Sequence, residues 1–254
     1  MIDIADTTGC NCEEKWNSRT VSLIGNEGAA ALACARVLVV GVGGVGGYTV
    51  EMLARSGVGH LTIVDADTVA ESNLNRQLIA IRPTIGKSKV ELFRERIKNI
   101  NPECVVTAME TFLEPESVEG IVGEGHFDMV IDAIDTVAPK VALIAWCMRH
   151  NIPVISSMGA GGRIDAAKVM MTDLWSTRED GLARAVRQRL KKMGLRRPLR
   201  VATSSEAPAG NALVKVDSRN KRTSYGTIST VPSVFGIMLA SEAICRLLAK
   251  DKRH

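Results

Sequence analysis

The feature that most constrains the fold is a glycine-rich turn between an apolar run and a segment with helical spacing. The apolar run is 35–40, the turn is 41–47 and the helical segment is 48–56. A short, continuous apolar run is typical of a strand buried on both faces of a parallel sheet. Glycines let the chain turn tightly and bring backbone N–H groups to an anion at a helix N-terminus. The turn therefore predicts a phosphate site in an α/β protein, at Gly41, Gly43, Gly44 and Gly46.

Charged residues that follow the next strands indicate which nucleotide the predicted phosphate site binds. Residues 61–64 are expected to form a second strand, and Asp65 follows it, placed to accept hydrogen bonds from ribose hydroxyls. An NAD dehydrogenase would show the same glycines and acid, so this motif alone leaves that alternative open. Arg76, Lys89 and Asp135 then lie in loops or at ends of elements where open α/β sheets bind ligands. Fixed cations and a carboxylate suit a triphosphate with Mg²⁺ better than a pyrophosphate.

Taken in order, these motifs resemble the adenylation core of the ubiquitin-activating enzyme (E1)-like superfamily. The resemblance rests on the glycine turn and on 64–67, 72–77, 86–90 and 132–135, and it extends from about residue 15 to 165. Members of this superfamily use ATP to adenylate a carboxylate, usually the C-terminus of a small β-grasp protein, or in one branch a carboxylate on a modified tRNA base. We therefore expect a Rossmann-like, doubly wound and mostly parallel sheet with helices on both faces and an antiparallel C-terminal extension.

The resemblance also implies roles for individual residues. Arg76 and Lys89 would hold phosphates, Asp135 would hold Mg²⁺, and Arg19 would extend into the ATP site of a partner subunit in a homodimer. The nucleotide-binding set that it implies is Gly41, Gly43, Gly44, Gly46, Asp65, Asp67, Ser72, Asn73, Asn75, Arg76, Lys89 and Asp135. The alternatives are an ordinary surface arginine at position 19 and an Asn-rich turn at 72–77. Asp132 is expected to be a structural capping carboxylate.

The cysteines bear on the choice of branch. There are six, at positions 10, 12, 34, 104, 147 and 245, and they form no Cys-x-x-Cys pair. Sulfur-carrier-activating members of the superfamily typically hold a structural zinc with two such pairs, so we expect no zinc. Cys10 and Cys12 are expected to be reduced thiols, and the other four to be small buried hydrophobic residues.

The second half of the chain resembles the branch that acts on tRNA. Segments 156–165, 168–174, 180–184 and 204–208 are similar to those of tRNA threonylcarbamoyladenosine dehydratases, which cyclise N6-threonylcarbamoyladenosine (t6A) at position 37. This resemblance covers roughly residues 15–250. It implies adenylation of the threonyl carboxylate by ATP and ring closure by the carbamoyl group of the base, with no catalytic cysteine. The main alternative is an adenylating enzyme for a ubiquitin-like or sulfur-carrier protein; a non-enzymatic nucleic-acid or redox module is the other.

A basic segment supports a tRNA substrate independently. Residues 178–200 contain nine basic and two acidic residues, a local charge of +7 against +4 for the whole chain. Helical spacing would turn Leu182, Val186, Leu190 and Met193 toward the protein. The side chains that we expect to neutralise tRNA phosphates are Arg184, Arg187, Lys191, Lys192, Arg196 and Arg197. The alternative is a solvated helix face without a ligand.

The domain organisation follows from length and hydrophobic content. We expect a flexible tail over 1–14 and a single adenylation domain over 15–254. Its parts would be a nucleotide-binding core at about 35–160, a basic substrate-binding part at about 161–230 and a C-terminal helix at about 232–250. The charge-free stretch 224–241 favours a core or dimer helix over a membrane span. Without a signal peptide in the sequence, we expect a cytoplasmic protein. The sequence does not decide whether 159–162 hold a monovalent cation or whether a cysteine-desulfurase or sulfur-acceptor system docks.

Overall fold

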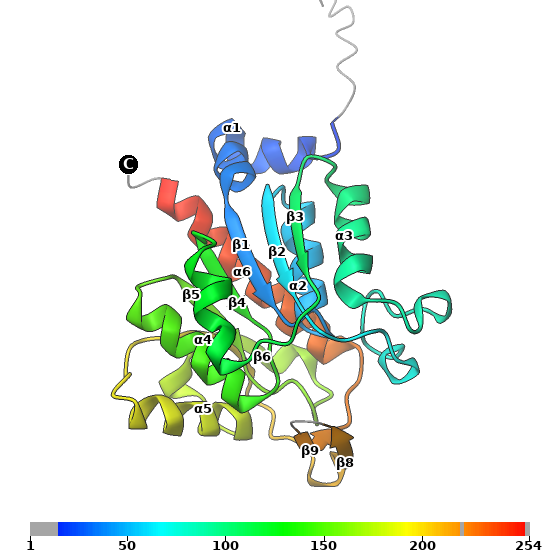
Figure 1. Ribbon diagram of the computed structural model, residues 1–254, viewed down its shortest axis with the longest axis vertical. Helices are drawn as coiled ribbons and strands as arrows, with labels where there is room; N and C mark the ends of the chain where they lie inside the picture. The colour runs from blue at the N-terminus through cyan, green and yellow to red at the C-terminus, as the bar shows by residue number, and fades with distance from the viewer. Residues whose placement is uncertain (1–14, 219–220, 252–254) are drawn as a thin grey trace, which may run out of the picture.

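The fold is given by a computed structural model that describes residues 15–218 and 221–251. Its centre is a seven-stranded sheet with the order β3-β2-β1-β4-β5-β7-β6 (Figure 1). The strands are β1 (Arg36–Val40), β2 (His60–Val64), β3 (Val105–Met109), β4 (Met129–Asp132), β5 (Val154–Ser157), β6 (Val169–Asp173) and β7 (Arg200–Ser204). Neighbouring strands are parallel except β6, which pairs antiparallel with β7. The expected Rossmann-like, mostly parallel sheet is confirmed.

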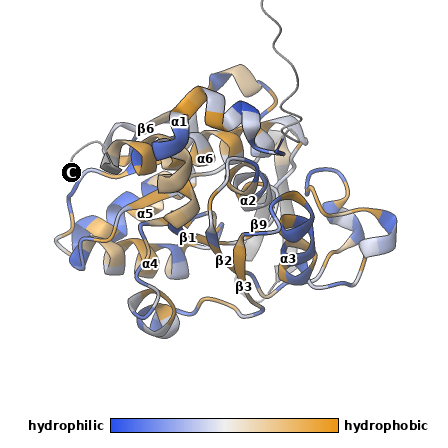
Figure 2. Cartoon of the chain, turned by 90° about the horizontal axis from the view of Figure 1, so that it is seen from above, coloured by the Kyte–Doolittle hydropathy of each residue, from blue (hydrophilic) through white to orange (hydrophobic). Residues whose placement is uncertain are grey.

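Helices cover both faces of this sheet. They are α1 (Ser18–Cys34), α2 (Gly46–Arg55), α3 (Lys89–Ile100), α4 (Val137–Arg149), α5 (Gly181–Lys192) and α6 (Thr230–Asp251). The strands contribute side chains to a hydrophobic core on each face of the sheet, because successive side chains of a strand point to opposite faces. Strand β1 is an example. Val37 and Val39 pack with residues of α1, α2, α3 and α6, whereas Leu38 and Val40 pack with residues of α4 and α5. In Figure 2, hydrophobic residues line the strands, while α3 carries hydrophilic residues on its surface.

The strand order places a ligand crevice between β1 and β4. From β1 the chain proceeds outward to β2 and β3, then returns to β4 on the other side of β1. Helices on the two sides of this switch point diverge, so the carboxyl ends of β1 and β4 border an open crevice. The glycine turn follows β1, and Asp135 lies beyond the end of β4. Both motifs therefore lie at the carboxyl end of the parallel strands.

Several expected boundaries differ from the structure. Strand β4 ends at Asp132, whose carboxylate accepts a hydrogen bond from the Ile134 N–H at 3.0 Å and so starts a turn within the motif 132–135. The helix expected from Tyr48 begins at Gly46, directly inside the glycine turn. The expected basic helix is α5, but Met193 forms its C-cap and is 43% exposed, so the prediction that Met193 faces the protein was wrong.

The antiparallel extension has two parts. One is the β6–β7 pair at the edge of the main sheet, and the other is a separate hairpin of β8 (Leu213–Ser218) and β9 (Lys221–Tyr225). Figure 1 shows this hairpin projecting from the end of the molecule opposite α1. That is the end at which the parallel strands finish, so the hairpin lies on the same side as the crevice.

Helix α6 contains a stretch, Thr230–Ala249, that is long and apolar enough to cross a membrane by length and composition. Its mean hydropathy is 1.6, and 44% of its most apolar window is buried inside the protein. The helix contacts α1, α2 and β6, and Val231, Phe235 and Leu239 belong to the hydrophobic core. These contacts are what a core helix makes, in line with the expectation for 224–241.

Candidate nucleotide site

The backbone of the glycine turn leaves too little room for side chains at its glycine positions. Gly41 has a φ of +85°, and a Cβ on Gly46 would lie 1.8 Å from the carbonyl oxygen of Gly41. Because α2 begins at Gly46 and the Gly47 N–H donates to the Gly43 carbonyl at 3.0 Å, the N–H groups left for an anion at this helix N-terminus are those of 43–46. A Cβ on Gly43 or Gly44 would contact the side chains of Gln77 and Arg76, at 3.5 and 3.4 Å respectively. The turn thus brings a helix N-terminus and an arginine to one place, as anion binding requires.

Asp65 braces this turn from β2. Its Oδ2 accepts a hydrogen bond from the Val42 N–H at 2.8 Å, and its Oδ1 accepts one from the Asp67 N–H at 2.9 Å. Burial raises the pKa of Asp65, although Lys89 and these backbone donors act in the opposite direction. Each carboxylate oxygen can accept a second hydrogen bond. Asp65 can therefore shape the turn and still accept hydrogen bonds from a ribose, the role that the sequence predicted.

Residues 72–77 form a compact segment beside the turn. Asn73 is buried and accepts a hydrogen bond from the Ala70 N–H at 3.1 Å, so its side chain holds its own 3₁₀ turn (Glu71–Asn73). Arg76 donates to the Ser72 carbonyl at 2.8 Å and to Asn75 Oδ1 at 2.9 Å. Burial lowers the pKa of Arg76, and attraction to Asp135 partly offsets that effect. Arg76 thus lies close enough to the carboxylate predicted to hold Mg²⁺ to interact with its charge, while Asn73 has a structural role that its sequence position did not reveal.

Lys89 and Asp67 form an ion pair at the start of α3. The Nζ of Lys89 lies 2.8 Å from Asp67 Oδ2, with the lysine side chain 4% exposed and the aspartate side chain 70% exposed. An ammonium group has three donors, so this pair leaves capacity for a phosphate oxygen. The sequence predicted both residues as nucleotide ligands but did not predict that they contact each other.

Asp135 is supported from beneath by a buried cluster. The Nζ of Lys140 lies 2.6 Å from Asp132 Oδ2 and also donates to Ser156 Oγ at 3.1 Å and to the Ser157 carbonyl at 2.9 Å. Because Asp132 also accepts from Ile134, the cluster fixes the turn that leads to Asp135. Asp132 is therefore structural, as expected, and Lys140 is the partner that sequence reasoning missed. The signal was an isolated lysine in the otherwise apolar segment 137–148.

The residues present fit a Mg²⁺ ion that arrives with a nucleotide. No group of three or more His, Cys, Asp or Glu in 15–218 and 221–251 is arranged to hold a metal. Asp135 supplies one hard oxygen ligand, and Mg²⁺ in nucleotide sites commonly takes one or two carboxylates together with phosphate oxygens and waters.

Arg19 is not brought to this crevice within one chain. It is exposed in the first turn of α1, next to a hollow of about 260 Å³ whose lining includes Trp16, Thr20, His60 and Val105. His60 and Val105 begin β2 and β3, so this hollow lies at the opposite end of the strands from the glycine turn. Any action of Arg19 on the site would therefore have to come from a second subunit.

The predicted tRNA-binding residues divide into two groups. Arg184, Lys191, Lys192 and Arg196 are exposed, and the guanidinium of Arg196 lies 5.8 Å from the Trp175 ring centroid. Arg187 differs from the outward orientation expected of it: it is half-buried and donates to the carbonyls of Leu174 and Thr177 at 3.2 and 3.1 Å. Arg197 is exposed, but its guanidinium also donates to the Met148 carbonyl at 2.5 Å. Arg187 and Arg197 therefore connect α5 and its following loop to the rest of the protein.

The start of α5 is joined to the glycine-rich link that follows β5. Asp180 caps the helix by accepting from the Ala183 N–H at 2.8 Å, and it also accepts from the Gly159 N–H at 2.9 Å. Arg163 is buried 3.5 Å from this carboxylate and also donates to the Gly159 carbonyl. Glu206 accepts from the Asp165 N–H at 2.9 Å. The link is thus rigidly held, and one carbonyl that a monovalent cation could use already has a donor.

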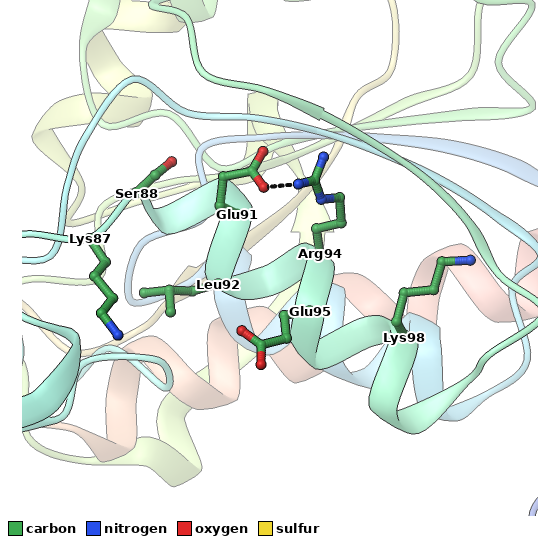
Figure 3. A pocket seen from close by; sticks show the side chains of 7 residues that line it. All are labelled: Lys87, Ser88, Glu91, Leu92, Arg94, Glu95 and Lys98. Atoms are coloured by element: carbon green, nitrogen blue, oxygen red, sulfur yellow. Dashed lines mark ion pairs between the residues drawn. The ribbon is translucent and has the colours of Figure 1, made fainter.

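Another hollow lies along the solvent-facing side of α3. Figure 3 shows the seven side chains that line it; five of them are charged, and two of these form the Glu91–Arg94 ion pair. Its volume is about 450 Å³, and its lining includes none of the predicted nucleotide-binding residues. It is a surface hollow separate from the crevice.

Comparison with known proteins agrees with this geometry. The sequence pattern described as "ThiF family" matches residues 17–254. The tRNA threonylcarbamoyladenosine dehydratase of Escherichia coli K12 is 37% identical over 267 residues, covering 95% of this chain and 97% of that protein. The crystal structure of E. coli tRNA N6-threonylcarbamoyladenosine dehydratase in complex with ATP superimposes with a TM-score of 0.87 at 36% identity, covering 100% of both chains.

A relative from another branch matches only part of the chain. The molybdopterin-synthase adenylyltransferase of E. coli K12 is 37% identical over 146 residues, which covers 58% of this chain and 57% of that protein. The dehydratase similarity therefore includes a large part of the chain that this similarity does not.

Proposed function

Because this chain belongs to the ThiF family, we propose that it uses ATP to cyclise t6A at position 37 of tRNA. The observation that carries the proposal is the convergence of the glycine turn, Arg76, Lys89 and Asp135 on one crevice, in a chain similar over nearly its whole length to t6A dehydratases. A crystal structure of one such relative in complex with ATP supports ATP as the nucleotide.

In the proposed complex, the residues of the crevice bind and orient the triphosphate. Backbone N–H groups of 43–46 would meet phosphate oxygens at the N-terminus of α2, and Asp65 would accept hydrogen bonds from the ribose. Lys89 would contact phosphate while it remains paired with Asp67, and Arg76 would approach the phosphates from 72–77. A Mg²⁺ ion held by Asp135 would neutralise phosphate charge.

The reaction needs little covalent chemistry from the protein. A threonyl carboxylate oxygen of t6A would bond to the α-phosphorus while pyrophosphate leaves, which gives an acyl-adenylate. The carbamoyl group of the same base would then attack the acyl carbon, lose its proton and expel AMP, so the base loses one water. Since the nucleophile belongs to the substrate, the contribution of the enzyme is positioning and electrostatic stabilisation. Single Cys→Ser variants should therefore keep turnover within a few-fold of wild type.

The proposal extends to the partners. Exposed basic side chains of α5 would contact tRNA phosphates, and Arg19 of a second subunit would complete the ATP site of a homodimer. Its distance from the crevice within one chain is the reason to invoke the second subunit. A docked sulfur-transfer partner, a cytoplasmic location and a monovalent cation stay predictions.

One alternative shares the whole ATP site. The partial similarity to molybdopterin-synthase adenylyltransferase favours, as second candidate, adenylation of a sulfur-carrier or ubiquitin-like protein C-terminus. To distinguish the two, the purified protein is incubated with ATP and Mg²⁺ together with t6A-containing tRNA, unmodified tRNA or a β-grasp protein ending in Gly-Gly. AMP release that requires t6A supports the dehydratase; pyrophosphate exchange that requires the protein C-terminus supports the alternative.

A further inference from the structure

Tyr225, at the end of β9, presents an aromatic ring beside the proposed ATP site. The residue is 41% exposed. It lies on the glycine-rich link, because a Cβ on Gly161 would come within 2.7 Å of Tyr225 Cβ and a Cβ on Gly162 within 3.0 Å of its Cδ1. The two glycines thus provide the space in which the tyrosine packs against backbone. A ring supported in this way offers its remaining surface to solvent in a fixed position.

Hydrogen bonds on both sides of Tyr225 connect it to the phosphate-binding segment. The next residue, Gly226, accepts from the Gly162 N–H at 2.8 Å. Thr227 then accepts from Asn75 Nδ2 at 3.0 Å, and Asn75 Oδ1 accepts from Arg76 Nη1 at 2.9 Å. Two residues of chain and the Asn75 side chain therefore separate Tyr225 from Arg76, whose side chain lies against Gly44. Figure 1 shows the β8–β9 hairpin at this end of the molecule.

The other aromatic residues are less suited to meet a base here. Phe93 and Phe235 are buried, and Tyr48 packs against Gly236 of α6. Trp146 stacks on His150, and Trp175 is covered by Arg196. The remaining three are Trp16, beside the hollow at the opposite end of the strands, Phe112, which follows the edge strand β3, and half-buried Phe127. Tyr225 is therefore the exposed aromatic residue that the described structure connects to the crevice.

We propose that Tyr225 stacks on a nucleobase of the tRNA anticodon loop while the modified base is in the site; this inference rests on the proposed function. Unpaired loop bases are commonly bound by stacking on aromatic side chains, which every base can do through its flat face. For adenylation, the threonyl carboxylate has to reach the α-phosphate above the glycine turn, so the loop must lie beside 72–77.

The test compares three variants at position 225 for the KM of t6A-containing tRNA, measured by AMP release, and for ATP affinity measured calorimetrically without tRNA. Tyr225→Ala should raise the KM for tRNA by about tenfold, because the base loses the aromatic face on which it stacks. Tyr225→Phe and Tyr225→Trp should stay within about threefold of wild type, since both keep a flat ring. Ile228→Ala, at a neighbouring position that is 46% exposed, is the matched control and should leave the KM for tRNA unchanged.

Each outcome decides one question. Unchanged ATP affinity in Tyr225→Ala, together with a raised KM for tRNA that Phe and Trp restore, supports the stacking role. A KM in Tyr225→Ala within twofold of wild type, or a rise that Tyr225→Phe shares, overturns it while leaving the dehydratase proposal intact. A wild-type protein that turns over no t6A-containing tRNA overturns the proposed function, and the stacking role with it.

Discussion

The Nζ of Lys140 lies 2.6 Å from Asp132 Oδ2, and both side chains are 0% exposed. The pair joins α4 to the end of β4, and Ser156 adds β5 by donating to the same carboxylate oxygen at 2.6 Å. Because Asp132 also holds the Ile134 N–H, this buried cluster determines where the chain leaves the sheet toward Asp135. A structural ion pair thus supports the loop that carries a proposed Mg²⁺ ligand.

Removing one member of this pair should destabilise the protein strongly. Lys140→Met leaves a buried carboxylate without its counterion, and we expect the free energy of unfolding in urea to fall by about 3–5 kcal/mol. Replacing both residues, as Lys140→Met with Asp132→Asn, should recover part of that loss, since no unpaired charge stays buried. A double variant that is no more stable than Lys140→Met would show that the ion pair is not the cause.

The glycine turn should not accept a side chain at position 46. In Gly46→Ala the new Cβ would meet the Gly41 carbonyl at 1.8 Å, so the turn has to open. We expect ATP affinity, measured by calorimetry, to fall by about 100-fold because the anion-binding N–H groups are displaced. Gly181→Ala is the matched control, as a Cβ there meets no atom within 4 Å, and its ATP affinity should equal that of wild type.

The parts of the fold that the sequence predicted are those with strong local signals. β1, β2 and β4 are buried parallel strands that read as continuous apolar runs, and the glycine turn marks the crossover from β1 to α2. β3 was not predicted, because it is an edge strand whose residues are all exposed or half-buried. Neither was α1, whose helical pattern is interrupted at Gly25 with a φ of 76°, nor α4, which is apolar almost all round and so lacks a clear period.

The candidate site was predictable as a set of residues but not as an arrangement. Motif order identified Asp67, Lys89 and Asp135, yet the Asp67–Lys89 pair depends on how β2 and α3 pack. The Lys140 cluster joins three elements, and a lone lysine in an apolar helix does not reveal its partners. For Arg187 the prediction from helical spacing was wrong. The spacing predicted a side chain that points to solvent, whereas its guanidinium turns toward the protein and donates to carbonyls of 174–177.

The cysteines should differ sharply in reactivity. Burial raises the pKa of Cys147 to about 12 and that of Cys104 to about 11, so both stay protonated thiols at pH 8. Cys34 and Cys245 are exposed, so the expectation that they are buried was wrong. A maleimide reagent at pH 8, followed by peptide mass analysis, should modify Cys34 and Cys245 and leave Cys104 and Cys147 unmodified until urea is added. Native-state labelling of Cys147 would contradict the buried environment; Cys10 and Cys12 lie outside the described residues.

The two kinds of arginine on α5 should give different phenotypes. Arg184→Ala, at an exposed residue, should reduce the dependence of log K for tRNA on log salt by roughly one and leave stability unchanged. Arg187→Ala should lower the free energy of unfolding by about 1–3 kcal/mol, because buried carbonyls lose their donor. Filter binding at several salt concentrations and urea unfolding separate the two effects. Equal salt dependence in wild type and Arg184→Ala would remove this residue from the proposed tRNA surface.

The central claim is that ATP turnover in this crevice removes water from t6A in tRNA. The most direct measurement is the mass of the position-37 nucleoside after incubation with ATP and Mg²⁺, alongside AMP release, in wild type and in Arg76→Ala. We predict that wild type converts t6A to a product lighter by one water with one AMP for each conversion, and that Arg76→Ala reduces kcat/KM by about 100-fold. Unchanged nucleoside mass with wild-type enzyme, or equal conversion by Arg76→Ala, would contradict the account.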